Sequence, residues 1–452
     1  MSSSPATPGA EGPDSSGRHR PTEVFSRFFL GLSPRVIGLA VVVGLLAGAV
    51  GAAYLWVLRQ LQRGLWPAHW SGAVGFAVLG GAGLFVGLWV RVLGPTGNVE
   101  LLVDNIHVTG GRSGLRELPA LIPASLVGIA AGQATGPEAP LVQSTGTLGA
   151  WFGERWALAA DDRRAVTIAG MAAGFAVLFG APLGAAIFAL EIPHRRGIEY
   201  TEALMPALVG ALGGYAVMLA THTQGLFAVW DMPQPGLLHL GDFGWALLAG
   251  VLGAVIAIAF TYLVTGLARI FERIPFVVRV TTGGLVLAAL ALWSPYALTF
   301  GEAQIASLLR HPLLAGGFAI ALLAKLVGTS VTVASGFRGG FIIPLFFMGC
   351  AGAYLVHAAF HNAPVWVMVP AMMSAANVGV TKTPLGSAIS VSEMGGVITL
   401  PTTVLASIVS LMLTSGVGLI HTQRERISDG PGGPVDDLGD GTTDVEGGAN
   451  GD

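Results

Sequence analysis

Long apolar stretches, each free of charged residues, occur throughout this chain and are separated by short polar breaks. Four of them cover residues 36–58, 72–90, 243–268 and 397–420. Each contains about the 20 residues that an α-helix needs to cross the hydrocarbon core of a bilayer. Buried helices of a soluble protein are the alternative, but such a protein would have to repeat charge-free runs of this length. The pattern therefore predicts an all-α integral membrane protein.

Pro and Gly interrupt many of the remaining apolar segments. Pro begins or ends a helix because it lacks a backbone N–H and restricts the residue before it. Non-helical backbone at membrane depth is tolerated only where it is buried in protein or lines a wet cavity. The breaks therefore predict broken half-helices that meet around a site, at Pro95, Pro137, Pro140, Pro182, Pro344 and Pro384.

One phrase occurs twice in the chain. Residues 182–191 read PLGAAIFALE and residues 384–393 read PLGSAISVSE, and a shorter segment precedes each, GPEAP at 136–140 and GFIIP at 340–344. Two related halves in a very apolar chain are typical of a transporter or channel built from a structural repeat. We assign the repeats roughly to residues 27–225 and 240–426, and the matching breaks within them point to the binding site.

Composition supports the membrane assignment and places the ends of the chain. Hydrophobic residues make up 53% of the chain and charged residues 11%, whereas soluble proteins carry about 25% charged residues. We expect residues 1–26 and the acidic residues 427–452 to be disordered, which leaves residues 27–426 as the membrane domain. The positive-inside rule predicts that both termini are cytoplasmic, because arginines flank the first and last apolar runs at Arg18, Arg20, Arg27, Arg35, Arg424 and Arg426.

Glu138 is the residue with the most specific candidate chemistry. It lies in the GPEAP segment, where Pro140 suits the first turn of a helix because its missing N–H costs nothing there. The free N–H groups of such a turn attract anions, and an ionised carboxylate can occupy and block that position. A protonated Glu138 loses the attraction and swings away, so one residue could couple proton and anion occupancy. The alternative is a Glu that pairs with an Arg or is hydrogen-bonded in a loop.

Two further breaks extend this arrangement. Residues 340–344 repeat it in the second half, and residues 94–98 form a third break. Three helix ends aimed at one point would bind an anion without a fixed Lys, which could hold the anion too tightly for release.

The other ionisable residues in apolar sequence give weaker signals. Glu191 and Glu393 end the repeated phrase, and we expect them at helix ends with a structural role. Arg338 and Lys382 lie beside the second-half breaks, where they either attract anions or are solvated. We expect no metal site, because no metal-ligand spacing with acids or Cys occurs at His107, His357 and His361.

Taken in order, these motifs resemble the CLC family of chloride channels and chloride/proton antiporters. Residues 136–140 are similar to the family's Gly-Arg/Lys-Glu-Gly-Pro loop, and residues 171–191 to its next segment. Residues 324–344 are similar to the region that ends in Gly-x-Phe-x-Pro, and residues 383–394 to the late Pro-Leu…Glu-Met block. The resemblance covers nearly the whole membrane domain.

The resemblance implies a CLC-type fold with two inverted-topology repeats, in a homodimer with one anion pathway per subunit. It makes Glu138 the gating and proton-coupling residue. It assigns anion coordination to the backbone N–H groups of Phe341 and Ile342 and to the hydroxyl of Thr96. The implied anion-binding set is Thr96, Gly97, Ala139, Gly340, Phe341, Ile342 and Ile420.

Several positions depart from the family pattern. Residues 95–99 replace the usual Gly-Ser-Gly-Ile-Pro loop, and Pro137 and Ala139 replace the basic residue and the Gly that flank the gate. Ile420 aligns best with the family's central Tyr. Ile192 occupies the position at which antiporters often carry a second glutamate for internal proton access.

The function implied by the resemblance is transmembrane chloride transport, which we interpret as chloride/proton antiport gated by Glu138. A passive voltage- or pH-gated chloride channel is the alternative, favoured by Ile192 and Ile420. Transport of fluoride or nitrate, and a membrane scaffold that binds partners without transport, stay open. We expect no enzymatic activity, no cofactor and no nucleic-acid partner. The expected partners are chloride, protons, the lipid bilayer and a second subunit, in a prokaryotic plasma membrane.

Overall fold

The computed structural model describes residues 34–65, 72–94, 96, 106, 114–194, 198, 200–223, 230–420 and 423. Helices dominate these residues and follow one another in the same order in two halves. The first half contains α2 (Pro34–Leu65), α3 (Gly72–Leu93), α5 (Leu118–Ala130), α6 (Glu138–Arg155), α7 (Ala160–Phe179), α8 (Pro182–Glu191) and α9 (Leu204–Ala220). The second contains α11 (Leu240–Phe271), α12 (Phe276–Trp293), α13 (Glu302–Arg310), α14 (Ala315–Ser335), α15 (Ile342–Ala359), α16 (Val365–Thr381), α17 (Pro384–Gly395) and α18 (Leu400–Leu413).

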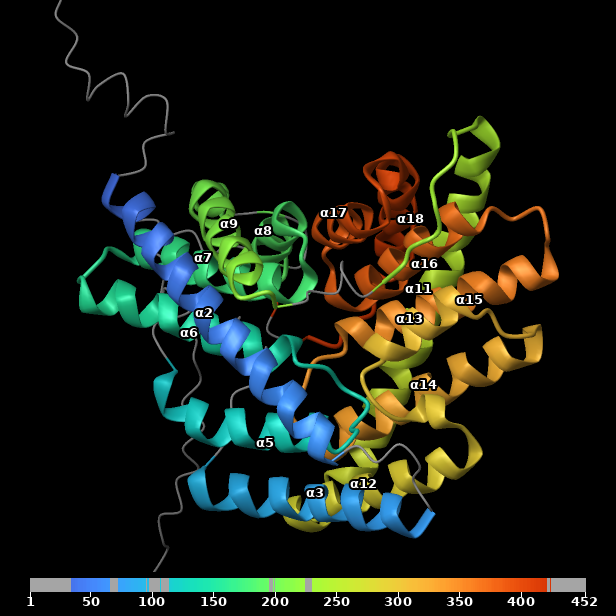
Figure 1. Ribbon diagram of the computed structural model, residues 1–452, viewed down its shortest axis with the longest axis horizontal. Helices are drawn as coiled ribbons and strands as arrows, with labels where there is room; N and C mark the ends of the chain where they lie inside the picture. Colours follow the sequence, from blue (N-terminus) through green and yellow to red (C-terminus); the bar gives the residue numbers. More distant parts are fainter. Residues whose placement is uncertain are drawn as a thin grey trace, which may run out of the picture.

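Helix lengths relate the two halves. α2 and α11 have 32 residues each, and α6 and α15 have 18 residues each. The other helices correspond in turn, α3 to α12, α5 to α14, α7 to α16, α8 to α17 and α9 to α18. Figure 1 shows the halves side by side, and they meet where α8 packs on α17 and α3 on α12.

The contact between α8 and α17 shows how the repeats are related. A Cβ added to Gly184 would collide with the backbone of Ser390, and one added to Gly386 would collide with the backbone of Phe188. Position 184 thus meets 390 while 386 meets 188, so the two helices run in opposite directions. Glycine permits this close approach because it has no side chain. The repeated phrase therefore forms an antiparallel pair, and the predicted inverted repeats are confirmed.

Seven helices in the described residues are long and apolar enough to span a bilayer. Three of the four predicted runs lie in α2, α3 and α11, which confirms the prediction of an all-α membrane protein. The fourth run, residues 397–420, is shorter than expected, because its α-helix, α18, begins after a 3₁₀ turn (Val397–Thr399) and ends at Leu413. Gly396, with a φ of 104°, fixes the sharp bend before this helix.

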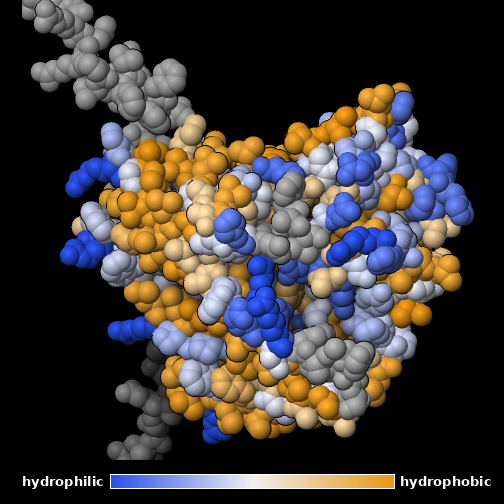
Figure 2. Space-filling model, in the orientation of Figure 1, coloured by the Kyte–Doolittle hydropathy of each residue, from blue (hydrophilic) through white to orange (hydrophobic). Residues whose placement is uncertain are grey.

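Polar surface is unevenly distributed on the molecule. In Figure 2, hydrophilic residues gather near the middle of the face that is shown, whereas hydrophobic residues cover much of its margin. An apolar margin suits contact with lipid, and a polar centre suits an aqueous approach to a site between the halves.

Candidate anion and proton site

The two short segments that precede the repeated phrase lie side by side. The N–H of Gly136 donates to the carbonyl of Gly340 at 2.8 Å, and the N–H of Gly340 donates back at 2.7 Å. This reciprocal pair is an antiparallel bridge between the halves. It places the first residues of α6 and α15, Glu138 and Ile342, next to each other although they are far apart in the sequence.

Proline positions explain why both helices begin here. Pro140 is the third residue of α6, and Pro344 is the third residue of α15. The first-turn N–H groups of a helix have no intrahelical acceptor, so a Pro there loses nothing, whereas farther along it would break the helix. The predicted half-helix starts at these two segments are confirmed. Both helix N-termini present N–H groups without intrahelical acceptors, and a positive partial charge, to the same region.

Glu138 occupies the space between the two helix N-termini. Its Oε1 accepts a hydrogen bond from the N–H of Ile343 at 2.6 Å, and its side chain is buried. Its Oε2 has no hydrogen-bond partner among the residues that the structure describes. Gly136 and Gly340 leave room for this carboxylate, because a Cβ on either would collide with Oε2. The carboxylate therefore stands at the N-terminus of α15, where a negative charge is favoured.

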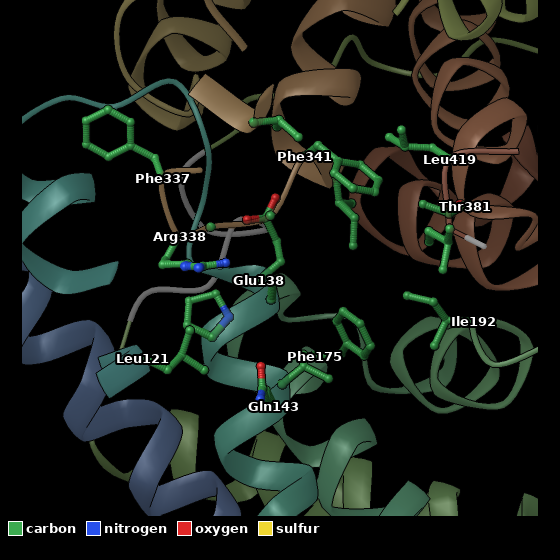
Figure 3. Close-up of a pocket in the computed structure, with 18 of the residues that line it drawn as sticks. Leu121, Glu138, Gln143, Phe175, Ile192, Phe337, Arg338, Phe341, Thr381 and Leu419 are labelled. Carbon is green, nitrogen blue, oxygen red and sulfur yellow. The ribbon is translucent and has the colours of Figure 1, made fainter. Parts of the chain in front are cut away.

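A cavity of about 220 Å³ adjoins the carboxylate. Figure 3 shows residues of its wall, with Glu138 near the middle and Ile192, Thr381 and Leu419 opposite. Five members of the predicted anion-binding set line this cavity together with Glu138, namely Ala139, Gly340, Phe341, Ile342 and Ile420. Residues from the beginnings of α6 and α15 and from the end of the membrane domain thus meet at one site.

The third predicted break, residues 94–98, contributes no described residue to the cavity wall. Thr96 is buried, and its Oγ1 has no hydrogen-bond partner in the described part of the chain, but Thr96 is not part of the cavity wall. Gly97 lies outside the described residues. A role for these two residues in anion binding stays a prediction.

Three residues at the site were not identified from the sequence. Ile343 donates the hydrogen bond to Glu138, and Thr381 lines the cavity. Gln423 fixes the far wall, because its Nε2 donates to the carbonyls of Ile192 at 2.9 Å and Thr381 at 2.7 Å. Of these three, only Ile343 could have been found from the sequence, because Pro344 marks a helix start and Ile343 lies in its first turn. The Gln423 contacts join parts of the chain with no common motif.

The glutamates that end the repeated phrase form a reciprocal pair of helix caps. Glu191 accepts from the N–H groups of Leu385 at 3.2 Å and Gly386 at 2.7 Å, at the start of α17. Glu393 accepts from the N–H groups of Leu183 at 3.3 Å and Gly184 at 2.8 Å, at the start of α8. A carboxylate stabilises a helix N-terminus. The structural role predicted for Glu191 and Glu393 is therefore confirmed.

Lys382 belongs neither to a solvated surface nor to the cavity wall. It is buried, and its Nζ donates to the carbonyls of Gly379 at 2.8 Å and Thr414 at 2.6 Å. Both carbonyls belong to helix C-terminal regions, where a positive charge is favourable. The expectation that Lys382 attracts anions or is solvated is therefore wrong, and it joins the ends of α16 and α18.

Inverted repeats with helix N-termini directed at a buried site are typical of membrane transport proteins. The profile of the voltage gated chloride channel family matches residues 82–415, so the chain belongs to this family. The chloride/fluoride channel protein of Pseudomonas syringae pv. tomato is 29% identical to it over 404 residues, which cover 86% of each protein.

Solved structures share the fold of this chain. A slow cyanobacterial Cl⁻/H⁺ antiporter superposes with a TM-score of 0.74 at 20% identity, over 85% of this chain and 95% of the other. A CLC-type fluoride/proton antiporter superposes with a TM-score of 0.71 at 23% identity, over 86% and 98%. These likenesses show a shared fold, and the predicted CLC-type fold is confirmed.

Proposed function

We propose that this protein exchanges chloride for protons across the membrane and that Glu138 couples the two ions. The observation that carries the proposal is the 2.6 Å hydrogen bond from the N–H of Ile343 to the Glu138 carboxylate, beside a cavity. A carboxylate held by helix N-terminal N–H groups occupies a position that also suits a halide. The anion and the carboxylate therefore compete for the same place.

Protonation of Glu138 changes the outcome of this competition. An ionised carboxylate binds the N-terminus of α15 and excludes an anion. A protonated carboxyl group has no net charge, so its attraction to the helix dipole is weaker and chloride can replace it. The exposed N–H groups of Phe341, Ile342 and Ile343 then face the anion. Each time the Glu138 side chain leaves the N-terminus of α15 and returns to it, a proton is carried in one direction and an anion passes in the other.

The cavity wall opposite Glu138 favours a second candidate, passive chloride conduction. Ile192 and Ile420 line the cavity and offer neither a proton acceptor nor a hydroxyl donor to the anion. Protons would then have to reach Glu138 through water. Under either reading we propose a homodimer in a prokaryotic plasma membrane, with both termini cytoplasmic.

Fluoride is a further candidate substrate. One relative is named a chloride/fluoride channel protein, and one structural neighbour is a fluoride/proton antiporter. Backbone N–H donors can bind either halide, which supports fluoride as a candidate beside chloride. Competition of fluoride with chloride flux in liposomes would reveal which anion the protein prefers.

Liposomes that contain the purified protein would test the exchange directly. Chloride efflux down its gradient should draw protons inward, so the external pH should rise in step with the efflux. Valinomycin and K⁺ dissipate the membrane potential that net charge movement would build up, so this potential does not limit the rate of chloride efflux. Fast chloride efflux without any change of external pH would exclude the antiporter and leave the channel.

Replacing Ile420 by Tyr should tighten anion binding. The change adds a hydroxyl donor to an apolar part of the cavity wall, and one hydrogen bond to a charged group contributes about 1.5–3 kcal/mol. We expect the half-saturating chloride concentration to fall by about tenfold, as 1.4 kcal/mol predicts. Ile420→Phe is the matched control because it adds the ring without the hydroxyl. Equal effects of both changes would show that ring volume, and not the hydroxyl, determines affinity.

A further inference from the structure

A second, much smaller cavity borders the segment that leads to Glu138. Its volume is about 10 Å³, which is enough for about one water molecule. Pro137, the residue before Glu138, forms part of its wall together with the polar side chains of Arg59, Gln62 and Glu302. These three side chains are half-buried, so the small cavity lies close to the surface of the protein. A polar cavity in this place connects the surroundings of Glu138 with solvent.

The backbone around Glu302 is held by contacts with other elements. Glu302 is the first residue of α13, and the chain bends sharply before it at Gly301, which has a φ of 104°. The carbonyl of Glu302 accepts a hydrogen bond from the indole N–H of Trp230 at 3.0 Å. Lys325 of α14 is buried and donates at 2.6 Å and 2.7 Å to two carbonyls of the segment just before α13. Glu302 therefore has a fixed place in the wall of the small cavity.

Charged groups of two other elements act on the Glu302 carboxylate. Arg59 of α2 lines the same small cavity, and its charge favours the ionised form of Glu302. The Glu138 carboxylate is close enough to repel that of Glu302. Burial raises the pKa of Glu302, and Arg59 offsets part of this rise. A carboxyl group in such surroundings can take up and release a proton closer to neutral pH than an exposed one.

The second oxygen of Glu138 lies against the same segment. Its Oε2 occupies space beside Gly136 that a Cβ would fill, and Gly136 is followed by Pro137 in the wall of the small cavity. Pro137 has no N–H, so it offers no donor that would hold the oxygen of a water or of a carboxylate there. The acids Glu138 and Glu302 therefore flank one short segment, with room for a water molecule beside it.

The course of α2 indicates which side of the membrane the small cavity faces. This helix has 32 residues, so it is about 48 Å long and longer than the hydrocarbon core is thick. It begins at the N-terminal side, which we place in the cytoplasm, and Arg59 and Gln62 lie in its last two turns. The small cavity therefore faces the outside of the cell if the proposed topology is correct.

We propose that Glu302 relays protons between the outside solution and Glu138 through one water molecule in the small cavity. This role rests on the proposed proton-coupled transport. Protonated Glu302 gives its proton to the water, and the water passes one of its own protons to ionised Glu138. One O–H bond breaks and one forms in each transfer, so the water is regenerated. Arg59 stabilises the Glu302 carboxylate until solvent protonates it again.

Liposomes that contain Glu302→Gln would test the relay, with chloride efflux and external pH recorded together. Because Glu138 must be protonated before an anion replaces it, slower protonation should slow both fluxes equally. We expect both to fall by about 10²-fold, the lower end of what a positioned acid contributes, with an unchanged ratio of protons to chloride. A lower pH on both sides of the membrane should restore much of the rate, because solvent then protonates Glu138 directly.

Two further variants separate a relay from an acid that only stabilises the first turn of α13 or pairs with Arg59. Arg59→Gln removes the positive charge but keeps the acid, so it should retain most of both fluxes, whereas a structural pair predicts equal losses. Asp231→Asn is the matched control, because Asp231 is exposed and adjoins Trp230, and it should behave as wild type.

Three results would overturn the relay. The first is an unchanged rate of both fluxes in Glu302→Gln. The second is a loss that Arg59→Gln shares or that a lower pH does not relieve, which would indicate a structural role. The third is a loss of proton uptake alone, because anions would then pass without protonation of Glu138.

Infrared spectroscopy of the detergent-solubilised protein tests the relay without transport. Comparison with Glu138→Gln identifies the carboxyl C=O band of protonated Glu138. After a rapid drop in pH, this band should appear about 10²-fold more slowly in Glu302→Gln than in wild type. If wild-type liposomes move no protons with chloride, the proposed exchange fails, but the infrared rates still decide the role of Glu302. Equal rates in the two proteins would exclude it.

Discussion

Replacing Glu138 by Gln should abolish the proton movement that accompanies chloride efflux, while chloride efflux itself persists. Gln has the shape of Glu but cannot carry a negative charge at any pH, so it cannot alternate between blocking and opening the N-terminus of α15. We expect proton uptake to fall by about 10²-fold or more, in line with the loss of a positioned acid–base group. Chloride efflux should also lose its dependence on pH.

The control for this change lies in the same helix. Glu154 is an exposed residue near the end of α6, and Glu154→Gln removes the same charge without touching the cavity. It should leave both fluxes unchanged. Proton uptake that survives in Glu138→Gln would show that another group carries the proton, and the coupling role of Glu138 would have to be abandoned. Loss of both fluxes would instead assign Glu138 a structural role.

The half-helix architecture could be predicted from the sequence because Pro is tolerated in the first turn of a helix and disfavoured in its interior. Pro140 and Pro344 are compatible with the first turn of a helix and with little else in apolar sequence, so they located both helix starts to within a residue or two. Glu138 followed from the same argument, since a membrane interior rarely holds an unpaired acid without a function.

The contacts across the repeats were not accessible from the sequence. Ile343 bonds to Glu138 only because the Gly136–Gly340 bridge sets the relative position of the two halves, and no local pattern encodes that register. Arg338 likewise contacts the ring of Phe276, the first residue of α12, only because of how α12 packs. The sequence could therefore identify a functional residue such as Glu138. The residue that contacts it, Ile343, could be identified only from the tertiary structure.

Replacing Glu191 by Ala should destabilise the fold much more than replacing Glu393 by Ala. Both glutamates cap the opposite helix with two N–H bonds, but Glu191 is 1% exposed, whereas Glu393 is only half-buried. Glu191→Ala leaves the N–H groups of Leu385 and Gly386 without acceptors in the protein interior, which costs about 3 kcal/mol. Water can replace Glu393 more easily, so we expect its loss to cost about 1 kcal/mol.

Denaturant-induced unfolding of the detergent-solubilised protein, followed by Trp fluorescence, would compare the two variants under identical conditions. Glu191→Gln provides a milder change, because its amide oxygen still accepts one hydrogen bond, and its loss of stability should fall between those of wild type and Glu191→Ala. The inverted repeat makes this comparison unusually direct, since the two sites share helix type, cap geometry and sequence phrase and differ mainly in burial. Equal losses for Glu191→Ala and Glu393→Ala would contradict the argument, because burial could not then determine the strength of each cap.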